Sequence, residues 1–226
     1  WAALAPDLCA IRWQGTDITW REVERRVAAT AIALRDLGVE RGDRVGCLMT
    51  NCPEFLVAVF ATTRLGALLV PLNTRLTAPE LAYIAGNAGV RVIATEATFG
   101  DVLDAADLTQ PQLLRESWPR PGGRPSPDSA AGWDDDAFIC YTSGTTGLPK
   151  GAVLTHRGVF FTSVDQMLAH GISHADRMYA PLPLCFTGGL VNVAMTMAHA
   201  GGTLVLEAQF EPGRALEQLE QERATI

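Results

Sequence analysis

Hydrophobic residues recur every three or four positions in the segment that follows Trp20. They are Val23, Val27, Ala31, Leu34 and Leu37. This spacing places them on one face of an amphipathic helix. Thr19 and Glu22 form a capping box at its start, and Gly38 ends it. Just upstream, turn-forming residues between apolar positions predict a hairpin over residues 13–20.

Short apolar runs alternate with helical patterns in the next part of the chain. Strands are predicted at residues 44–49, 67–71 and 90–95. Pro53 suits the first turn of a helix that continues to residue 65. Thr77 and Glu80 form a second capping box, and the helix they start ends near the glycine at 86 or 89. This alternation predicts an α/β fold, doubly wound, with mainly parallel sheets and flanking helices.

The composition changes at residues 119–136, which are rich in proline and glycine and end in Asp134, Asp135 and Asp136. We interpret this stretch as a surface linker. The acidic triplet lacks the spacing of a cation loop, which favours a solvated turn or strand cap over a metal site. The predicted division is a first α/β portion at 1–118, the linker at 119–136 and a second portion at 137–226.

A second set of elements is predicted beyond the linker. Strands are expected at 137–141, 151–154, 179–182 and 203–206, and helices at 155–168, 190–198 and 212–223. The most apolar region, Leu190–Leu206, is interrupted by Asn192, His199 and a glycine pair. This pattern predicts a helix, a turn and a strand, and no transmembrane segment.

The segment Tyr141–Gly151 joins two of the predicted strands and is dense in phosphate-binding groups. Glycines let backbone N–H groups approach an anion closely, hydroxyls donate to phosphate oxygens, and a lysine adds a positive charge. One hydroxyl, that of Thr142, is predicted to reach a bound Mg²⁺. The predicted phosphate-binding residues are Thr142, Ser143, Gly144, Thr145, Thr146, Gly147 and Lys150. The alternative is an ordinary surface loop rich in serine, threonine and glycine.

The spacing within this loop excludes a Walker site. A Walker loop has four residues between its glycines, then Lys-Ser or Lys-Thr, at a strand-to-helix turn. Here two residues separate Gly144 from Gly147, Lys150 follows three positions later, and a strand comes next. The strand–loop–strand setting suggests a flap that closes over phosphates without the help of a helix dipole.

Charge and cysteine content narrow the possible partners. The formal net charge of −7 argues against a nucleic-acid-binding surface. The five cysteines include no CxxC pair, and we expect them to be buried thiols in a reducing, cytoplasmic compartment. Because the chain begins with Trp1 and not with methionine, we expect its natural start to lie upstream.

Several motifs resemble those of the adenylate-forming (AMP-binding) superfamily, which includes acyl- and aryl-CoA synthetases, peptide-synthetase adenylation domains and luciferases. Residues 141–156 are similar to its phosphate-loop signature. Further similarities lie at 42–45 (GDRV), 51–55 (NCPEF) and 64–73 (RLGALLVPLN). The resemblance runs from Trp13 to Ile226 and indicates the first part of the large N-terminal domain. The details are more similar to acyl-CoA synthetases, that is, fatty-acid–CoA ligases, than to peptide-synthetase domains.

The resemblance implies an ATP-dependent carboxylate:CoA ligase. A carboxylic acid would attack the α-phosphorus of ATP to give an acyl-adenylate and pyrophosphate, and the thiol of CoA would then displace AMP. The implied requirements are ATP, Mg²⁺ and CoA as co-substrate. Loop donors together with Mg²⁺ would stabilise the charge that builds on the departing pyrophosphate.

A second segment, residues 181–190, is similar to the superfamily's acyl-pocket motif. The resemblance assigns Cys185, Phe186, Gly188 and Gly189 to the acyl pocket. Phe186 stands where the superfamily commonly has histidine, so a polar contact is lost. Two interpretations stay open for Phe186: a wall of the acyl pocket, or a core residue. His156 is interpreted as a residue of the helix cap and not as a catalyst.

The superfamily's later motifs do not occur in this sequence. They include a YGxTE segment, a TGD whose Asp holds the ribose, and a C-terminal domain with the catalytic lysine. We therefore assign no catalytic residue within 1–226 and expect the chain alone to be inactive. Alternatives are a non-catalytic nucleotide-binding or interaction module, and an adenylation domain that loads a carrier protein. If the chain ends inside an α/β sheet, apolar surface that further strands would cover is exposed. Pairing of two copies through this surface predicts a homodimer.

Overall fold

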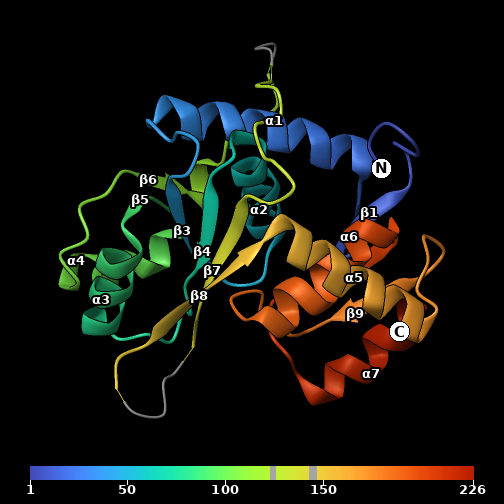
Figure 1. The fold of residues 1–226 in the computed structure, drawn as a ribbon. Coiled ribbons are helices and arrows are strands. Elements are labelled where there is room, and N and C mark those ends of the chain that lie inside the picture. Colours follow the sequence, from blue (N-terminus) through green and yellow to red (C-terminus); the bar gives the residue numbers. More distant parts are fainter. Residues whose placement is uncertain (123–125, 143–146) are drawn as a thin grey trace. The chain divides into compact units, whose positions relative to one another are not determined.

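Two β-sheets organise the residues that the computed structural model describes, which are 1–122, 126–142 and 147–226. One sheet has six strands in the order β6-β5-β3-β4-β7-β8, and the other has four in the order β2-β1-β10-β9 (Figure 1). The chain divides into two compact units. The first unit comprises Trp1–Arg25, Thr50–Leu56 and Gly158–Ile226, and the second comprises Arg26–Met49 and Val57–Arg157.

The six-stranded sheet belongs to the second unit. Its strands are β3 (Arg44–Leu48), β4 (Leu68–Pro71), β5 (Val90–Thr95), β6 (Gln112–Leu114), β7 (Asp136–Thr142) and β8 (Lys150–Thr155). All neighbouring strands from β6 to β7 pair in parallel. β7 and β8 pair antiparallel and form a hairpin at one end of the strand order (Figure 1).

Helices flank these strands and bury a core of aliphatic side chains. The helices are α1 (Trp20–Asp36), α2 (Pro53–Leu65), α3 (Ala78–Ala88) and α4 (Gly100–Ala105), with 3-10 turns at Ala97–Phe99 and Arg115–Ser117. One core cluster joins Leu81 and Ile84 of α3 to Ile93 of β5 and Leu103 of α4. Burial of such side chains is the main stabilising contribution to a sheet of this kind.

Capping interactions fix where α3 begins and ends. The backbone N–H and the hydroxyl of Thr77 both donate to the Glu80 carboxylate, at 2.8 and 2.7 Å. Gly89 ends the helix with a φ of 64°, a left-handed conformation that favours glycine. The capping box predicted at Thr77 and Glu80 is therefore confirmed.

The four-stranded sheet belongs to the first unit. Its strands are β1 (Cys9–Trp13), β2 (Thr16–Thr19), β9 (Arg177–Ala180) and β10 (Thr203–Leu206). β10 pairs in parallel with both β1 and β9, while β1 and β2 form the predicted hairpin. The helices are α5 (His156–His170), a π-helix at Gly188–Met195, α6 (Thr196–Ala200) and α7 (Pro212–Gln221).

The predicted fold class, mainly parallel sheets with flanking helices, is confirmed. Two short elements, α4 and β6, were not predicted, and β9 begins two residues before its predicted start. The helix predicted at 190–198 begins at Gly188 and is a π-helix as far as Met195. The two compact units do not divide at residues 119–136, and the linker there stays a prediction.

Within the described ranges, none of the helices combines the length and the apolar character needed to cross a membrane.

Candidate functional site

The hairpin of β7 and β8 places Thr142 and Lys150 opposite each other. They are the last register pair before the loop, in a ladder that starts at Asp136 and Thr155. Thr142, Gly147 and Lys150 are all exposed. A hydroxyl and an ammonium group therefore lie together where the loop leaves the sheet. The other predicted phosphate ligands, Ser143, Gly144, Thr145 and Thr146, lie outside the described residues.

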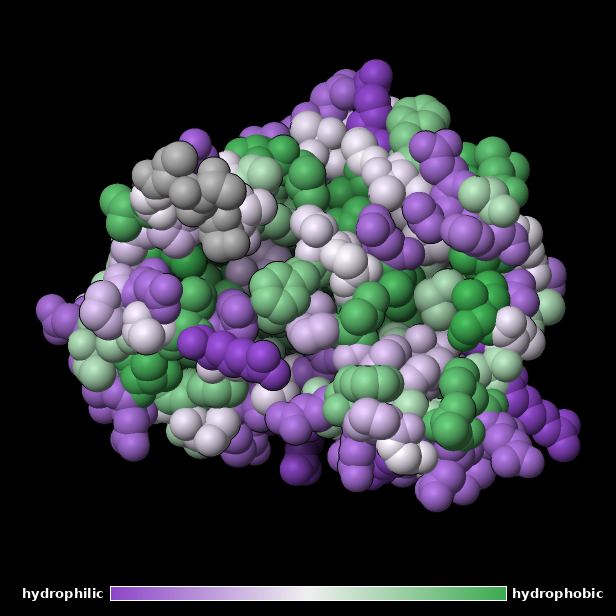
Figure 2. Space-filling view, turned by 90° about the horizontal axis from the view of Figure 1, so that it is seen from below, coloured by the Kyte–Doolittle hydropathy of each residue, from purple (hydrophilic) through white to green (hydrophobic). Residues whose placement is uncertain are grey.

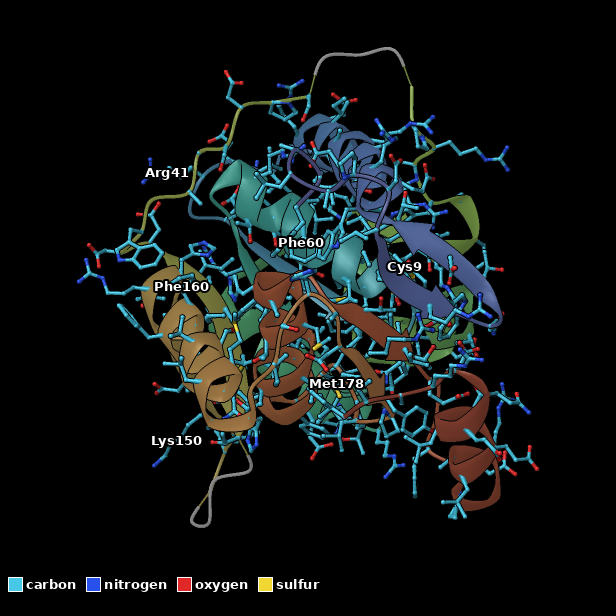
Figure 3. The ribbon with its side chains drawn as sticks, turned by 90° about the vertical axis from the view of Figure 1, so that its right-hand side faces the viewer. Cys9, Arg41, Phe60, Lys150, Phe160 and Met178 are labelled. Carbon is cyan, nitrogen blue, oxygen red and sulfur yellow. The ribbon has the colours of Figure 1, made fainter. Side chains whose placement is uncertain are left out.

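Lys150 is the only lysine in the sequence. Its side chain extends away from the ribbon at the start of β8 (Figure 3). Among the described residues, no carboxylate lies within ion-pair distance of it. An exposed ammonium without an acidic partner can pair with an anionic ligand without first breaking an ion pair.

Tyr141 fixes the loop end of the hairpin, where it pairs with Gly151. Its hydroxyl donates to Oδ1 of Asn87, on α3, at 2.5 Å. A Cβ at Gly151, on the facing strand, would lie 3.0 Å from Cζ of Tyr141 and 2.8 Å from Cγ2 of Ile139. The ring therefore covers Gly151, and only glycine fits beneath it. Burial raises the pKa of Tyr141, which keeps its hydroxyl protonated as a donor.

The predicted Mg²⁺ contact at Thr142 fits the chemistry of this ion. Mg²⁺ usually takes few protein ligands and fills its other positions with water and substrate phosphates. A single protein hydroxyl beside a phosphate-binding loop is compatible with this coordination. In the described part of the chain, no group of three or more His, Cys, Asp or Glu side chains could hold a metal ion.

The acidic triplet leads from a turn into β7, whose first residue is Asp136. Asp135 accepts the N–H of Gly132 at 2.7 Å and the Arg41 guanidinium at 2.6 Å, and these contacts hold its pKa below the ordinary value. Asp134 pairs with Arg157 at 2.7 Å. The interpretation of this triplet as a turn or strand cap is confirmed.

His156 lies at the start of α5, as predicted for a cap residue. Its backbone N–H donates to the carbonyl of Asp135 at 3.0 Å. Its Nε2 is buried, with no hydrogen-bond partner among the described residues. Burial lowers the pKa of His156, and the nearby Asp135 carboxylate opposes that shift. A neutral, half-buried ring is in keeping with a structural role.

The predicted acyl-pocket residues lie together in a tight turn that leads into the π-helix. The N–H of Phe186 donates to the carbonyl of Pro183 at 3.2 Å. A Cβ at Gly189 would collide with the same carbonyl. Phe186 is 48% exposed, so the interpretation as a core residue is wrong. Cys185 is half-buried, which leaves the turn with two neighbouring side chains that a ligand can reach.

Comparison with known proteins identifies the family of the chain. A family model described as AMP-binding enzyme matches residues 1–226. The chain belongs to this family.

Relatives in the AMP-binding enzyme family include CoA ligases. The chain is 36% identical to feruloyl-CoA synthase of an Amycolatopsis species, covering 100% of this chain and 46% of the relative. It is 33% identical to a long-chain-fatty-acid–CoA ligase of Mycobacterium tuberculosis, covering 100% of this chain and 47% of the relative. The chain thus spans about half the length of the curated relatives it matches.

Solved structures of other proteins share the fold. The N-terminal domain of FACL13 from Mycobacterium tuberculosis, with inhibitor bound, matches with a TM-score of 0.91 at 32% identity, over 99% of this chain and 59% of that one. O-succinylbenzoate coenzyme A synthetase from Bacillus subtilis, in complex with ATP and magnesium ion, matches with a TM-score of 0.91 at 25% identity, over 100% of this chain and 60% of that one.

Two features of this AMP-binding enzyme chain were not found from sequence. One is the set of contacts that Asn51 makes, which is described below. The other is a cavity of about 320 Å³ at the carboxyl ends of β1 and β10, whose lining includes Arg12, Glu207, Arg214 and Glu222. Both arginines are already paired, Arg12 with Glu222 at 2.8 Å and Arg214 with Glu207 at 3.5 Å. The sequence signal that could have indicated this cavity was the position of polar residues just after predicted strands, because ligands of α/β folds often bind there.

Proposed function

We propose that this chain acts as the N-terminal part of an ATP-dependent carboxylate:CoA ligase. In this reaction a carboxylate oxygen bonds to the α-phosphorus of ATP, pyrophosphate leaves, and the CoA thiol then displaces AMP from the acyl group. Membership of the AMP-binding enzyme family supports ATP as substrate. The names of the relatives support a carboxylic acid and CoA as the other substrates.

The observation that carries the proposal is the pairing of Thr142 with Lys150 at the end of the β7–β8 hairpin. Negative charge builds on the leaving pyrophosphate, and fixed donors and cations lower the barrier by stabilising that charge. Lys150 would bind the terminal phosphates, and Thr142 would place a hydroxyl oxygen beside them. Bound Mg²⁺ would neutralise phosphate charge, with Thr142 as one ligand. The predicted roles of Ser143, Gly144, Thr145, Thr146 and Gly147 as phosphate donors belong to the same proposal.

The turn at Cys185, Phe186, Gly188 and Gly189 is proposed to form part of the acid-binding pocket. The exposed ring of Phe186 would contact the apolar part of the carboxylic acid. We also propose that residues 1–226 alone bind nucleotide without turnover, because the later motifs of the family do not occur in this sequence. Robust acid-dependent exchange of pyrophosphate into ATP by the 226-residue chain would contradict this.

A protease experiment tests the nucleotide part of the proposal. A lysine-specific protease can cut this chain only at the Lys150–Gly151 bond, because Lys150 is its one lysine. We expect Mg·ATP to slow this cut by about tenfold, because bound phosphates engage the ammonium that the protease must recognise. Mass spectrometry of the two cleavage fragments over time measures the rate of cleavage.

Matched variants and a control complete this experiment. Lys150→Ala should weaken binding of a fluorescent ATP analogue by about 10- to 100-fold, the range for loss of a charge-assisted contact. Lys150→Arg should retain most of the affinity. Arg21→Ala, which removes an exposed arginine paired with Asp7, should leave the affinity unchanged. Equal cleavage with and without Mg·ATP, together with unchanged affinity in Lys150→Ala, would contradict the proposal.

A further inference from the structure

Asn51 is a buried side chain whose hydrogen bonds all reach distant parts of the first unit. It is 5% exposed and lies between β3 and α2 in the sequence. Its Nδ2 donates to the carbonyls of Leu182 and Glu207, each at 3.0 Å. Its Oδ1 accepts the N–H of Leu184 at 2.8 Å. Both donors and the acceptor of the amide are therefore used.

These bonds hold the chain on both sides of Pro183. The carbonyl of Leu182 and the N–H of Leu184 are fixed to one rigid amide, and the bond to Glu207 ties that amide to the end of β10. A buried amide with all partners satisfied specifies one backbone conformation, because any other leaves a buried polar group unpaired.

The position of Phe186 depends on Pro183. The Pro183 carbonyl accepts the N–H of Phe186 at 3.2 Å, and the Phe186 carbonyl accepts the N–H of Leu190 at 2.9 Å. Gly189 packs directly on the Pro183 carbonyl, where a Cβ would collide. The π-helix begins at Gly188, and such helices occur often at functional sites. A shift of Pro183 would therefore move both Phe186 and the start of the π-helix.

We propose that Asn51 is a positioning residue that fixes the turn at residues 182–189 and, through Phe186, determines which carboxylic acids bind. The part of this inference that concerns acids rests on the proposed function, whereas the part that concerns the turn does not. Asn51 contacts the backbone of the turn and acts on the substrate only through it.

Asn51→Asp tests the positioning directly. The variant keeps an oxygen for the Leu184 N–H but places a second oxygen against the carbonyls of Leu182 and Glu207, where two donated hydrogen bonds were. We expect the Cys185 thiol to react with iodoacetamide about tenfold faster in Asn51→Asp than in the wild type, because the turn is no longer held. Peptide mass spectrometry assigns the labelled cysteine.

Two internal references support this measurement. Cys9 is the other half-buried thiol, and burial, aided by Asp17, raises its pKa to about 11, so it should react slowly in every variant. Ser163→Ala is the matched control. It removes a fully buried hydroxyl of the same unit, whose bond goes to the Val159 carbonyl within α5. This control should leave the Cys185 rate unchanged.

The acid-binding part is tested in the protein as it is expressed from its natural gene. Steady-state kinetics with ferulate, indoleacetate and a long-chain fatty acid should show KM values for the acids changed unequally by Asn51→Asp, by about fivefold or more, with the KM for ATP unchanged. A general loss of stability would change both kinds of KM or only the amount of active enzyme. Equal changes for all acids would overturn the role in selecting acids.

Separate outcomes distinguish the two proposals. If the wild type shows no acid-dependent reaction with ATP but Cys185 reacts faster in Asn51→Asp, the proposed function fails and the positioning stands. An unchanged Cys185 rate in a folded variant overturns the positioning. If Asn51→Asp does not fold, hydrogen exchange in the wild type decides. The Leu184 amide should then be protected at least 100-fold relative to an unstructured peptide, and rapid exchange would overturn the proposal.

Discussion

At the residue scale, Asn51 and His156 show two ways of burying a polar group. The amide of Asn51 has partners for all its hydrogen-bonding groups, whereas Nε2 of His156 has none among the described residues. An unpartnered ring nitrogen is tolerable only while the imidazole is neutral, because a buried charge without a partner is far more costly. Stability should therefore depend on pH at His156.

The direction of the pH dependence of stability follows from the lowered pKa of His156. Burial lowers the pKa of His156 in the folded state below its ordinary value of 6.5, so the unfolded chain takes up a proton first as pH falls. The stabilising contribution of the neutral ring is complete above that ordinary value, and it is lost progressively as pH falls below it and through the lower pKa of the folded state. Urea unfolding at about pH 7.5 and pH 5 measures this, and the wild type should lose more stability than His156→Gln. If the free energy of unfolding changed equally with pH in the wild type and in His156→Gln, His156 would not contribute to the pH dependence of stability.

At the element scale, α7 is attached to two strands through one carboxylate. Glu222, just after the helix, pairs with Arg12 of β1 at 2.8 Å and Arg177 of β9 at 3.1 Å, and its side chain is 11% exposed. The guanidinium of Arg177 also donates to the Glu222 carbonyl at 2.7 Å. Breaking a partly buried pair costs more than breaking an exposed one, because the remaining charges keep only weak partners.

We expect Glu222→Gln to lower the free energy of unfolding by about 2 kcal/mol, the usual size for charge-assisted hydrogen bonds. Amide hydrogen exchange should become faster mainly in α7 and at the start of β9. The control is Asp7→Asn, which breaks the exposed pair between Asp7 and Arg21 and should cost about 0.5 kcal/mol or less. Equal effects of the two variants would argue against an anchoring role for Glu222.

Local sequence signals were enough to predict most of the elements. Thr77, Glu80 and Gly89 act within one helix, so their pattern predicts α3 without knowledge of the fold. α4 and β6 were missed because they are only six and three residues long, too short for a hydrophobic period to stand out. Strand order is set by packing between distant segments, which no local pattern reports.

At the scale of the whole molecule, the site also combines residues that local sequence patterns reveal with residues that only packing between distant segments brings together. The predicted phosphate-binding residues of the loop lie close together in the sequence, so their pattern alone indicated phosphate binding, which stays a prediction. The partners of Asn51 lie 131, 133 and 156 positions away, and no spacing rule could find them. A buried asparagine indicates that its amide has hydrogen-bond partners, but the sequence does not identify them.

Self-association of the chain is a further prediction at this scale. Hydrophobic side chains are exposed among polar ones on the face shown in Figure 2. On and around α7, Phe210, Leu216, Leu219 and Ile226 are all exposed, Leu216 by 72%. Apolar surface of this kind favours burial against a second copy. Light scattering at increasing concentration should therefore show dimers of the 226-residue chain.

The double variant Leu216→Lys with Leu219→Lys should reduce this dimerisation by about tenfold or more, because each substitution places a charge in the apolar surface. Leu4→Lys is the control, since Leu4 is also an exposed leucine, at 81%, but lies at the other end of the sequence. A wild type that stays monomeric at all concentrations would remove the basis for the dimer.

The place of β8 at the end of the strand order has a consequence for solubility. An outermost strand presents backbone groups with which a strand of another molecule can pair, and a lysine on such a strand discourages this. Lys150 is the only charged residue of β8, and Val153 on the same strand is 52% exposed. Lys150→Ala therefore removes an obstacle to aggregation as well as a phosphate contact. Lys150→Arg, which retains the charge, separates the two effects.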